Sequence, residues 1–174
     1  MRLDKNYFPL DEFINKALYN SKSGFYMKKN PFGKNGDFIT SPNISILFSE
    51  MLSVWTVDFW QNLNCPKKIN LIELGSGNGQ MIYDMINSLK NFTKFYNSCN
   101  FYILEKSPYL KKVQKQKLKN FNIKWINNIS KINNEHNIPK KNDACWATKT
   151  PCVGGVDHFI VKKKYGFKIF YRKK

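Results

Sequence analysis

Apolar residues recur at helical spacing in the first third of the sequence. Residues 9–19 carry such a stripe, which predicts a short helix, and the glycine-containing residues 24–40 are predicted to form a loop with short extended pieces. Ser41-Pro42 marks a second helix start, because proline is tolerated in the first turn of a helix. One long helix is predicted from there to about Leu63. Its expected core positions are Ile44, Leu47, Phe48, Met51, Leu52, Trp55, Phe59 and Trp60.

The middle of the sequence alternates short apolar runs with helical patterns. The apolar runs predict buried strands at 69–74, 101–104 and 123–126. Helices are predicted to begin near Gly79 and at Ser107-Pro108. Strands that alternate with helices form parallel β-α-β units, so we expect an α/β fold built on a parallel sheet.

The last third departs from this alternation. Residues 142–155 show no strand periodicity and lack the lysine, asparagine and isoleucine bias of their surroundings. The pattern of residues 158–172 is that of paired strands and predicts a basic β-hairpin around Tyr165-Gly166. The sequence therefore predicts a parallel sheet followed by an atypical segment and a C-terminal hairpin.

The positive charge of the chain is concentrated in its second part. The formal charge is +17, and residues 106–174 hold 18 of the 29 basic but only 3 of the 12 acidic side chains. Such asymmetry suggests nucleic acid or an anionic surface as a partner. However, Arg2 and Arg172 are the only arginines, and arginine is the residue suited to bidentate phosphate and guanine contacts. A lysine-coated surface is the simpler interpretation.

Composition excludes several other classes. Hydrophobic residues make up 42% of the chain, enough for a packed core. No apolar run reaches the ~18 residues of a membrane-spanning helix, and the first residues lack the apolar stretch of a secretory signal. The four cysteines are then expected to be reduced thiols in a cytoplasmic protein. They form no C-x-x-C pair, and no metal site is predicted.

The glycine-rich segment Glu73-Leu-Gly-Ser-Gly-Asn-Gly-Gln80 follows a predicted strand and opens a predicted helix. This is the context of a nucleotide-type loop, in which glycines let the backbone approach a ligand closely. Gln80 stands where the dinucleotide fingerprint needs glycine, and the Gly-Lys-Ser/Thr of a phosphate-binding P-loop is absent. The remaining pattern is E-x-G-x-G-x-G.

Glu105 directly follows the second predicted strand. In a parallel sheet its carboxylate would emerge at the same edge as the glycine loop. A carboxylate there can accept hydrogen bonds from both hydroxyls of a ribose. The loop and Glu105 together predict a nucleoside-binding site; the alternative is an ordinary strand–helix turn beside a surface glutamate.

Residues 73–79 resemble motif I, and Glu105 the acidic motif, of the class I S-adenosylmethionine-dependent methyltransferases. The N-terminal part narrows the resemblance to the MidA-like family. Its motifs are collinear over residues 10–110 and read Ala17-Leu-Tyr19, Gly24-Phe-Tyr26, Pro31-Phe-Gly33, Gly36-Asp-Phe-Ile-Thr40 and Glu105-Lys-Ser-Pro108.

This resemblance implies a Rossmann-like fold, S-adenosylmethionine as cofactor and a protein arginine on a partner subunit as methyl acceptor. Mitochondrial members of the family assist respiratory complex I assembly, so a eukaryotic chain would act in the mitochondrial matrix and a bacterial one in the cytoplasm. The cofactor-binding residues implied are Glu73, Gly75, Ser76, Gly77, Gly79, Glu105 and Asn127.

Two of the expected site residues carry open alternatives. Asn127 follows the third predicted strand and would border the adenine; otherwise it is a plain loop residue. An arginine acceptor needs a carboxylate to pair with its guanidinium, and Asp37 is the candidate. Its alternative is a turn aspartate bonded to its own backbone. No catalytic residue is assigned.

The chain also departs from the family pattern. Near Asp143 the family would show a strand ending in Asn-Glu-Phe and then an Asp-Ala-Leu-Pro loop, and a longer second half of the sheet would follow. We therefore expect a truncated member with a helical extension (1–64), the first half of the Rossmann-like domain (65–141) and an atypical segment with a hairpin (142–174). Half a sheet would leave an edge and an apolar face uncovered, which favours self-association.

Three functions remain open on the sequence alone. The first is a methyltransferase that binds S-adenosylmethionine. The second is a non-catalytic relic or scaffold that keeps the first half of the fold and binds a protein partner. The third is a basic nucleic-acid-binding protein that uses residues 106–174.

Overall fold

The computed structural model describes residues 9–129, 144–149, 158–163 and 166–171. One six-stranded sheet runs through it in the order β3-β2-β1-β4-β5-β6. The strands are β1 (Ile69–Leu74), β2 (Cys99–Leu104), β3 (Ile123–Ile126), β4 (Ala144–Lys149), β5 (His158–Lys163) and β6 (Gly166–Tyr171). The first four strands are parallel; β5 pairs antiparallel with β4, and β6 pairs antiparallel with β5. The predicted α/β class with a parallel sheet is confirmed.

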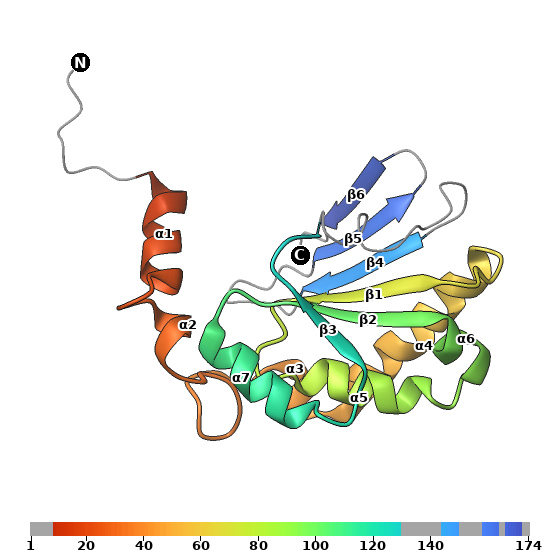
Figure 1. Cartoon of the computed structure of the whole chain (residues 1–174), viewed down its shortest axis with the longest axis horizontal. Coiled ribbons are helices and arrows are strands. Elements are labelled where there is room, and N and C mark those ends of the chain that lie inside the picture. Colours follow the sequence, from red (N-terminus) through yellow and green to blue (C-terminus); the bar gives the residue numbers. More distant parts are fainter. Residues whose placement is uncertain (1–8, 130–143, 150–157, 164–165, 172–174) are drawn as a thin grey trace, which may run out of the picture.

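Seven helices lie within the described residues. They are α1 (Leu10–Tyr19), α2 (Phe25–Lys28), α3 (Ser41–Ile44), α4 (Ile46–Asn62), α5 (Gln80–Leu89), α6 (Thr93–Ser98) and α7 (Pro108–Lys117). Helices α3 to α7 lie on one side of the sheet, whereas α1 stands apart from it at the N-terminal end (Figure 1). None of the described helices is long and apolar enough to span a membrane.

The main core fills the space between the sheet and helices α4 and α5. Alternate residues of a strand point to opposite faces, and Ile69, Leu71 and Ile103 face these helices. The α5 side chains buried against them are Met81, Ile82, Met85, Ile86 and Leu89. This packing holds β1 and α5 in place on either side of the glycine-rich loop that connects them.

The opposite face of the sheet carries Ile72, Tyr102 and Ile126. All three side chains are buried, with exposed fractions of 0%, 1% and 6%. The expectation of an uncovered apolar face is therefore wrong at these positions.

Helix α4 differs from its prediction in both start and orientation. A short helix α3 takes the predicted start at Ser41, and α4 then begins after Ser45, whose hydroxyl accepts from the Leu47 N–H at 3.3 Å. Segment 24–40, predicted as loop, contains the one-turn helix α2. Four residues predicted as core on the long helix are instead exposed by 41–73%: Ile44, Leu47, Met51 and Trp55.

The buried side of α4 is lined by small polar residues. Ser49, Ser53 and Thr56 are fully buried. Their small side chains allow α4 to lie close to α5, and the Ser53 and Thr56 hydroxyls donate to carbonyls of their own helix at 2.8 and 2.6 Å. Trp60 is buried as predicted, and its indole N–H donates to the Pro66 carbonyl at 2.9 Å.

Strand β4 corrects the interpretation of residues 142–155. Although no strand was predicted there, Ala144–Lys149 pairs with β1 in parallel along its whole length. Interior parallel strands need no polar–apolar alternation, so periodicity gives no signal for them. The β5–β6 hairpin is confirmed. Residues 150–157 and the turn residue Tyr165 lie outside the described residues.

Candidate cofactor site

The loop between β1 and α5 is held in a tight, glycine-dependent conformation. Gly75, Gly77 and Gly79 have φ angles of 71°, 54° and 77°, in the left-handed region that favours glycine. The Gly75 N–H donates to the Leu104 carbonyl at 2.9 Å, which ties the loop to the end of β2. At Gly77 an added Cβ would meet the Phe32 ring at 3.2 Å. The glycines therefore allow the backbone to turn tightly, and Gly77 also allows the Phe32 ring to lie close to the loop.

Glu73 is buried beneath this loop. Its side chain is 1% exposed, and the Ser76 hydroxyl donates to its Oε2 at 2.6 Å. Its Oε1 is buried and has no hydrogen-bond partner among the residues that the structure describes. Burial raises the pKa of Glu73 from 4.5 to about 7. The Ser76 hydrogen bond lowers this pKa, the charge of Glu105 raises it, and the Ile82 backbone N–H lowers it.

Glu105 lies at the same edge of the sheet, as predicted. Leu74 and Leu104 are register partners in the parallel β1–β2 pair, so Gly75 and Glu105 follow at matching positions. The carboxylate is buried and accepts from the Ser107 N–H at Oε1 and from the Gln114 amide at Oε2, both at 2.9 Å. The two glutamates thus flank the loop from neighbouring strands.

Gln114 is a residue of this site that sequence reasoning missed. It is fully buried in α7, and its Nε2 also donates to the Gly77 carbonyl at 2.9 Å. A signal was present, because Gln114 lies four residues after Leu110 and four before Leu118, both buried. A glutamine within an apolar stripe indicates a buried polar partner.

The N-terminal segment lies against the glycine loop. The rings of Tyr26 and Phe32 stack with centroids 5.9 Å apart, and Phe32 borders Gly77. The Ser107 hydroxyl donates to the Tyr26 carbonyl at 2.5 Å. The Asn78 amide donates to Asn43 Oδ1 at 2.9 Å. These contacts bring residues 25–43 to the edge where both glutamates lie.

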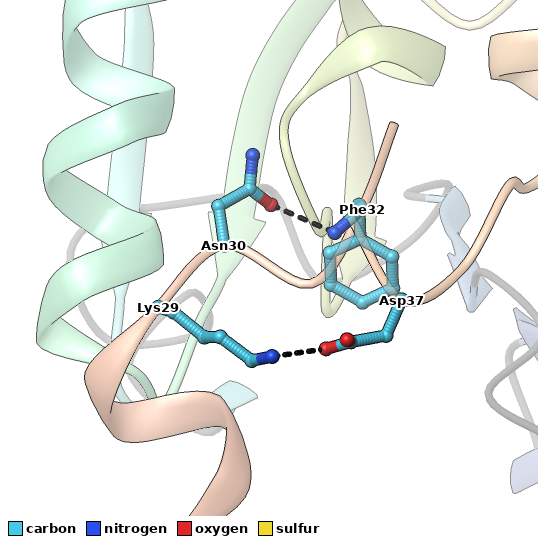
Figure 2. Close-up of polar contacts among 4 residues, drawn as sticks. All are labelled: Lys29, Asn30, Phe32 and Asp37. Carbon is cyan, nitrogen blue, oxygen red and sulfur yellow. Dashed lines mark hydrogen bonds and ion pairs between the residues drawn. The ribbon is translucent and has the colours of Figure 1, made fainter. Parts of the chain in front are cut away.

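Asp37 takes part in an exposed ion pair. Its Oδ2 lies 2.6 Å from Lys29 Nζ, and the neighbouring Phe32 N–H donates to Asn30 Oδ1 (Figure 2). The loop is closed by the Phe38 N–H, which donates to the Pro31 carbonyl at 2.8 Å. Lys29 thus compensates the charge that was expected to face an acceptor.

Asn127 lies at the same sheet edge but at its margin. It follows β3, whose Ile126 pairs in register with Leu104. Its side chain is exposed and accepts from Lys111 Nζ at 3.0 Å. The structure therefore brings Glu73, the glycine loop and Glu105 together around Gln114, with Asn127 on the adjoining strand.

Comparison with known proteins decides the family. A family model of S-adenosyl-L-methionine-dependent methyltransferases matches residues 51–148, which include β1, the glycine loop and Glu105. The chain belongs to this methyltransferase family.

Curated relatives carry a more specific name. The Drosophila melanogaster protein arginine methyltransferase NDUFAF7 homolog, mitochondrial, is 40% identical over 111 residues, which are 63% of this chain and 25% of the relative. The Danio rerio NDUFAF7 protein is 30% identical over 161 residues, 91% of this chain and 36% of the relative. The chain thus spans about a quarter to a third of the length of these relatives.

A solved structure shares the methyltransferase fold. The Burkholderia thailandensis protein bound to S-adenosyl-homocysteine superposes with a TM-score of 0.59 at 16% identity, covering 95% of this chain and 45% of that one. At this identity the likeness concerns the fold alone.

The residues present fit the family's cofactor. S-adenosylmethionine carries a ribose diol, an ammonium and a positively charged sulfur. Glu73 offers a buried carboxylate beside the loop for a cationic group, and Glu105 has carboxylate lone pairs beyond the two already used. The left-handed glycines keep the backbone of the loop free of side chains at the place where a ligand would lie.

Proposed function

We propose that this chain binds S-adenosylmethionine at the edge formed by Glu73, the glycine loop and Glu105, and transfers its methyl group to a protein arginine. The observation that carries the proposal is the meeting of the two buried glutamates with the left-handed glycine loop in a chain of this family. The names of the curated relatives support arginine as acceptor.

Each group has a distinct role in this proposal. Glu105 accepts from the ribose hydroxyls, Glu73 faces the cationic methionine part, and Gly75, Ser76, Gly77 and Gly79 form the floor beneath it. Asn127 borders the adenine. The bound cofactor supplies an activated methyl group, so the protein's task is to align the acceptor and exclude water.

Asp37 is the proposed contact for the acceptor. A guanidinium would replace Lys29 as the partner of this carboxylate, since the Lys29–Asp37 pair is exposed and such pairs contribute only about 0–1 kcal/mol. The acceptor would then lie beside the aromatic residues Phe32 and Phe38 of the same loop.

The location is proposed from the names of the relatives, and the partner is proposed from the family resemblance. Their names place them in mitochondria, which supports the mitochondrial matrix for a eukaryotic chain and the cytoplasm for a bacterial one. A subunit of respiratory complex I is the proposed protein partner. A second candidate is a non-catalytic form that binds the cofactor but does not transfer its methyl group.

The test is methyl transfer from radiolabelled S-adenosylmethionine to an arginine-containing peptide, with a matched peptide whose arginines are replaced by lysine. We expect labelling of the arginine peptide alone, lost in Glu105→Gln and kept in Glu12→Gln, an exposed glutamate of α1. Cofactor binding without labelling would support the non-catalytic form. Equal labelling by wild type and Glu105→Gln would contradict the proposed site.

A further inference from the structure

Gln114 joins three parts of the site through one amide group. It lies in α7 and is fully buried. Its Nε2 donates to the Gly77 carbonyl and to Glu105 Oε2, both at 2.9 Å. Its Oε1 accepts from the Trp125 indole N–H at 3.0 Å. We propose that Gln114 is the positioning residue of the cofactor site, which sets the separation and orientation of the Glu105 carboxylate and the glycine loop.

The donors and the acceptor of the Gln114 side-chain amide each face a group of the complementary kind. A primary amide has two N–H donors and a carbonyl acceptor. Both donors face oxygen atoms, and the indole of Trp125 can only donate. A flipped amide would place its oxygen against two other oxygens and its N–H groups against the indole N–H. Trp125 therefore fixes which way the amide of Gln114 points.

The contact with Gly77 also orients the loop backbone. In a trans peptide the C=O and the following N–H point in opposite directions. Because Gln114 holds the Gly77 carbonyl on the α7 side, the Asn78 N–H points away from α7. Gly77 itself has a left-handed φ of 54°.

The contact with Glu105 leaves a defined part of its carboxylate for a ligand. Each carboxylate oxygen has about two lone-pair positions. The Ser107 N–H occupies one on Oε1, and the Gln114 amide occupies one on Oε2. One position on each oxygen remains, which matches a ligand with two adjacent hydroxyls. This role rests on the proposed function, since the ligand in question is the cofactor ribose.

The test is a double-variant cycle measured by calorimetric titration with S-adenosylhomocysteine. Gln114→Leu removes both donors, and we expect binding about 10- to 100-fold weaker. Gln116→Leu, the same change at an exposed glutamine of the same helix, is the matched control and should leave binding unchanged. In the Glu105→Gln background the effect of Gln114→Leu should be several-fold smaller, since the carboxylate to be positioned is gone.

The outcomes separate the two proposals. A folded wild-type chain that does not bind S-adenosylhomocysteine overturns the proposed function and this inference with it. If wild type binds and Glu105→Gln weakens binding, while Gln114→Leu binds like wild type, the positioning role alone is overturned. An equal loss from Gln114→Leu in both backgrounds also overturns it, because Gln114 would then act independently of the Glu105 carboxylate.

A second variant keeps the test decisive if Gln114→Leu does not fold. Gln114→Glu keeps the size and the acceptor for Trp125 but places a carboxylate beside that of Glu105. Protonation of the introduced carboxyl restores one donor, so the affinity for S-adenosylhomocysteine should rise as the pH falls. A pH profile parallel to that of wild type would contradict the proposal.

Discussion

At the scale of single residues, the site depends on groups buried against their intrinsic preference. Glu73 is an ionisable side chain with one satisfied and one unsatisfied oxygen, and burial shifts its pKa to about 7. Such perturbed carboxyls are characteristic of functional sites, where binding or catalysis offsets the cost of burial. The shift also makes the stability of the chain depend on pH.

We predict that the free energy of unfolding falls as the pH rises through the titration range of Glu73. Its folded pKa, about 7, lies above the ordinary value of 4.5. The stabilisation from the protonated form is thus fully present below about pH 4.5 and lost as the pH rises past 7. The difference between the two pKa values corresponds to roughly 3 kcal/mol of unfolding free energy.

Urea unfolding at pH 5 and pH 8 measures this effect in wild type and in Glu73→Gln, which stays neutral. Wild type should lose stability relative to Glu73→Gln on going to pH 8. Glu12→Gln, changed at an exposed position, should follow wild type. A constant difference between wild type and Glu73→Gln at the two pH values would show that Glu73 does not titrate in this range.

The sequence predicted the individual site residues unevenly. The glycines and Glu105 carry local signals, because strand, loop and strand end are recognisable from neighbouring residues. Gln114 was missed because it stands in a lysine-rich helix, and the partner that makes it important is Gly77, 37 positions away. The apolar stripe of α7 indicates that Gln114 is buried, but it does not specify which groups its amide contacts.

At the scale of elements, helix α4 shows how a correct helix can be given the wrong face. Its sequence has more apolar residues than its buried face holds. Ser53 and Thr56 are buried in the structure, whereas Leu47 and Met51 are exposed to solvent. Close packing on α5 selects small side chains rather than large ones. Strand β4 was missed for the related reason that parallel pairing with β1 leaves no periodic pattern.

A matched pair of variants on α4 tests this assignment. Met51→Gln, at a side chain 70% exposed, should change the free energy of unfolding by less than about 0.5 kcal/mol. Val57→Ala, at a side chain 6% exposed, should cost about 1–2 kcal/mol through lost burial and a small cavity. Urea unfolding of both variants provides the measurement. A larger loss of unfolding free energy for Met51→Gln than for Val57→Ala would contradict this assignment of the buried and exposed faces of α4.

At the scale of the whole molecule, lysines of the basic part, residues 106–174, contact other described residues of the chain. Lys106 lies over the Tyr19 ring, Lys115 over Trp125, and Lys111 donates to Asn127. These contacts favour a lysine-coated surface, while binding of nucleic acid stays a prediction. The division into residues 1–64, 65–141 and 142–174 also stays a proposal, although β4 joins the last two parts in one sheet.

The central claim is that this chain, whose matches cover 25% and 36% of two curated relatives, carries a cofactor site centred on Glu105. Calorimetric titration of wild type and Glu105→Gln with S-adenosylhomocysteine tests it most directly. We expect binding in the micromolar range by wild type and at least about tenfold weaker binding by Glu105→Gln, since charged hydrogen bonds to the ribose are lost. A folded wild-type chain that does not bind, or two chains that bind equally, would contradict the claim.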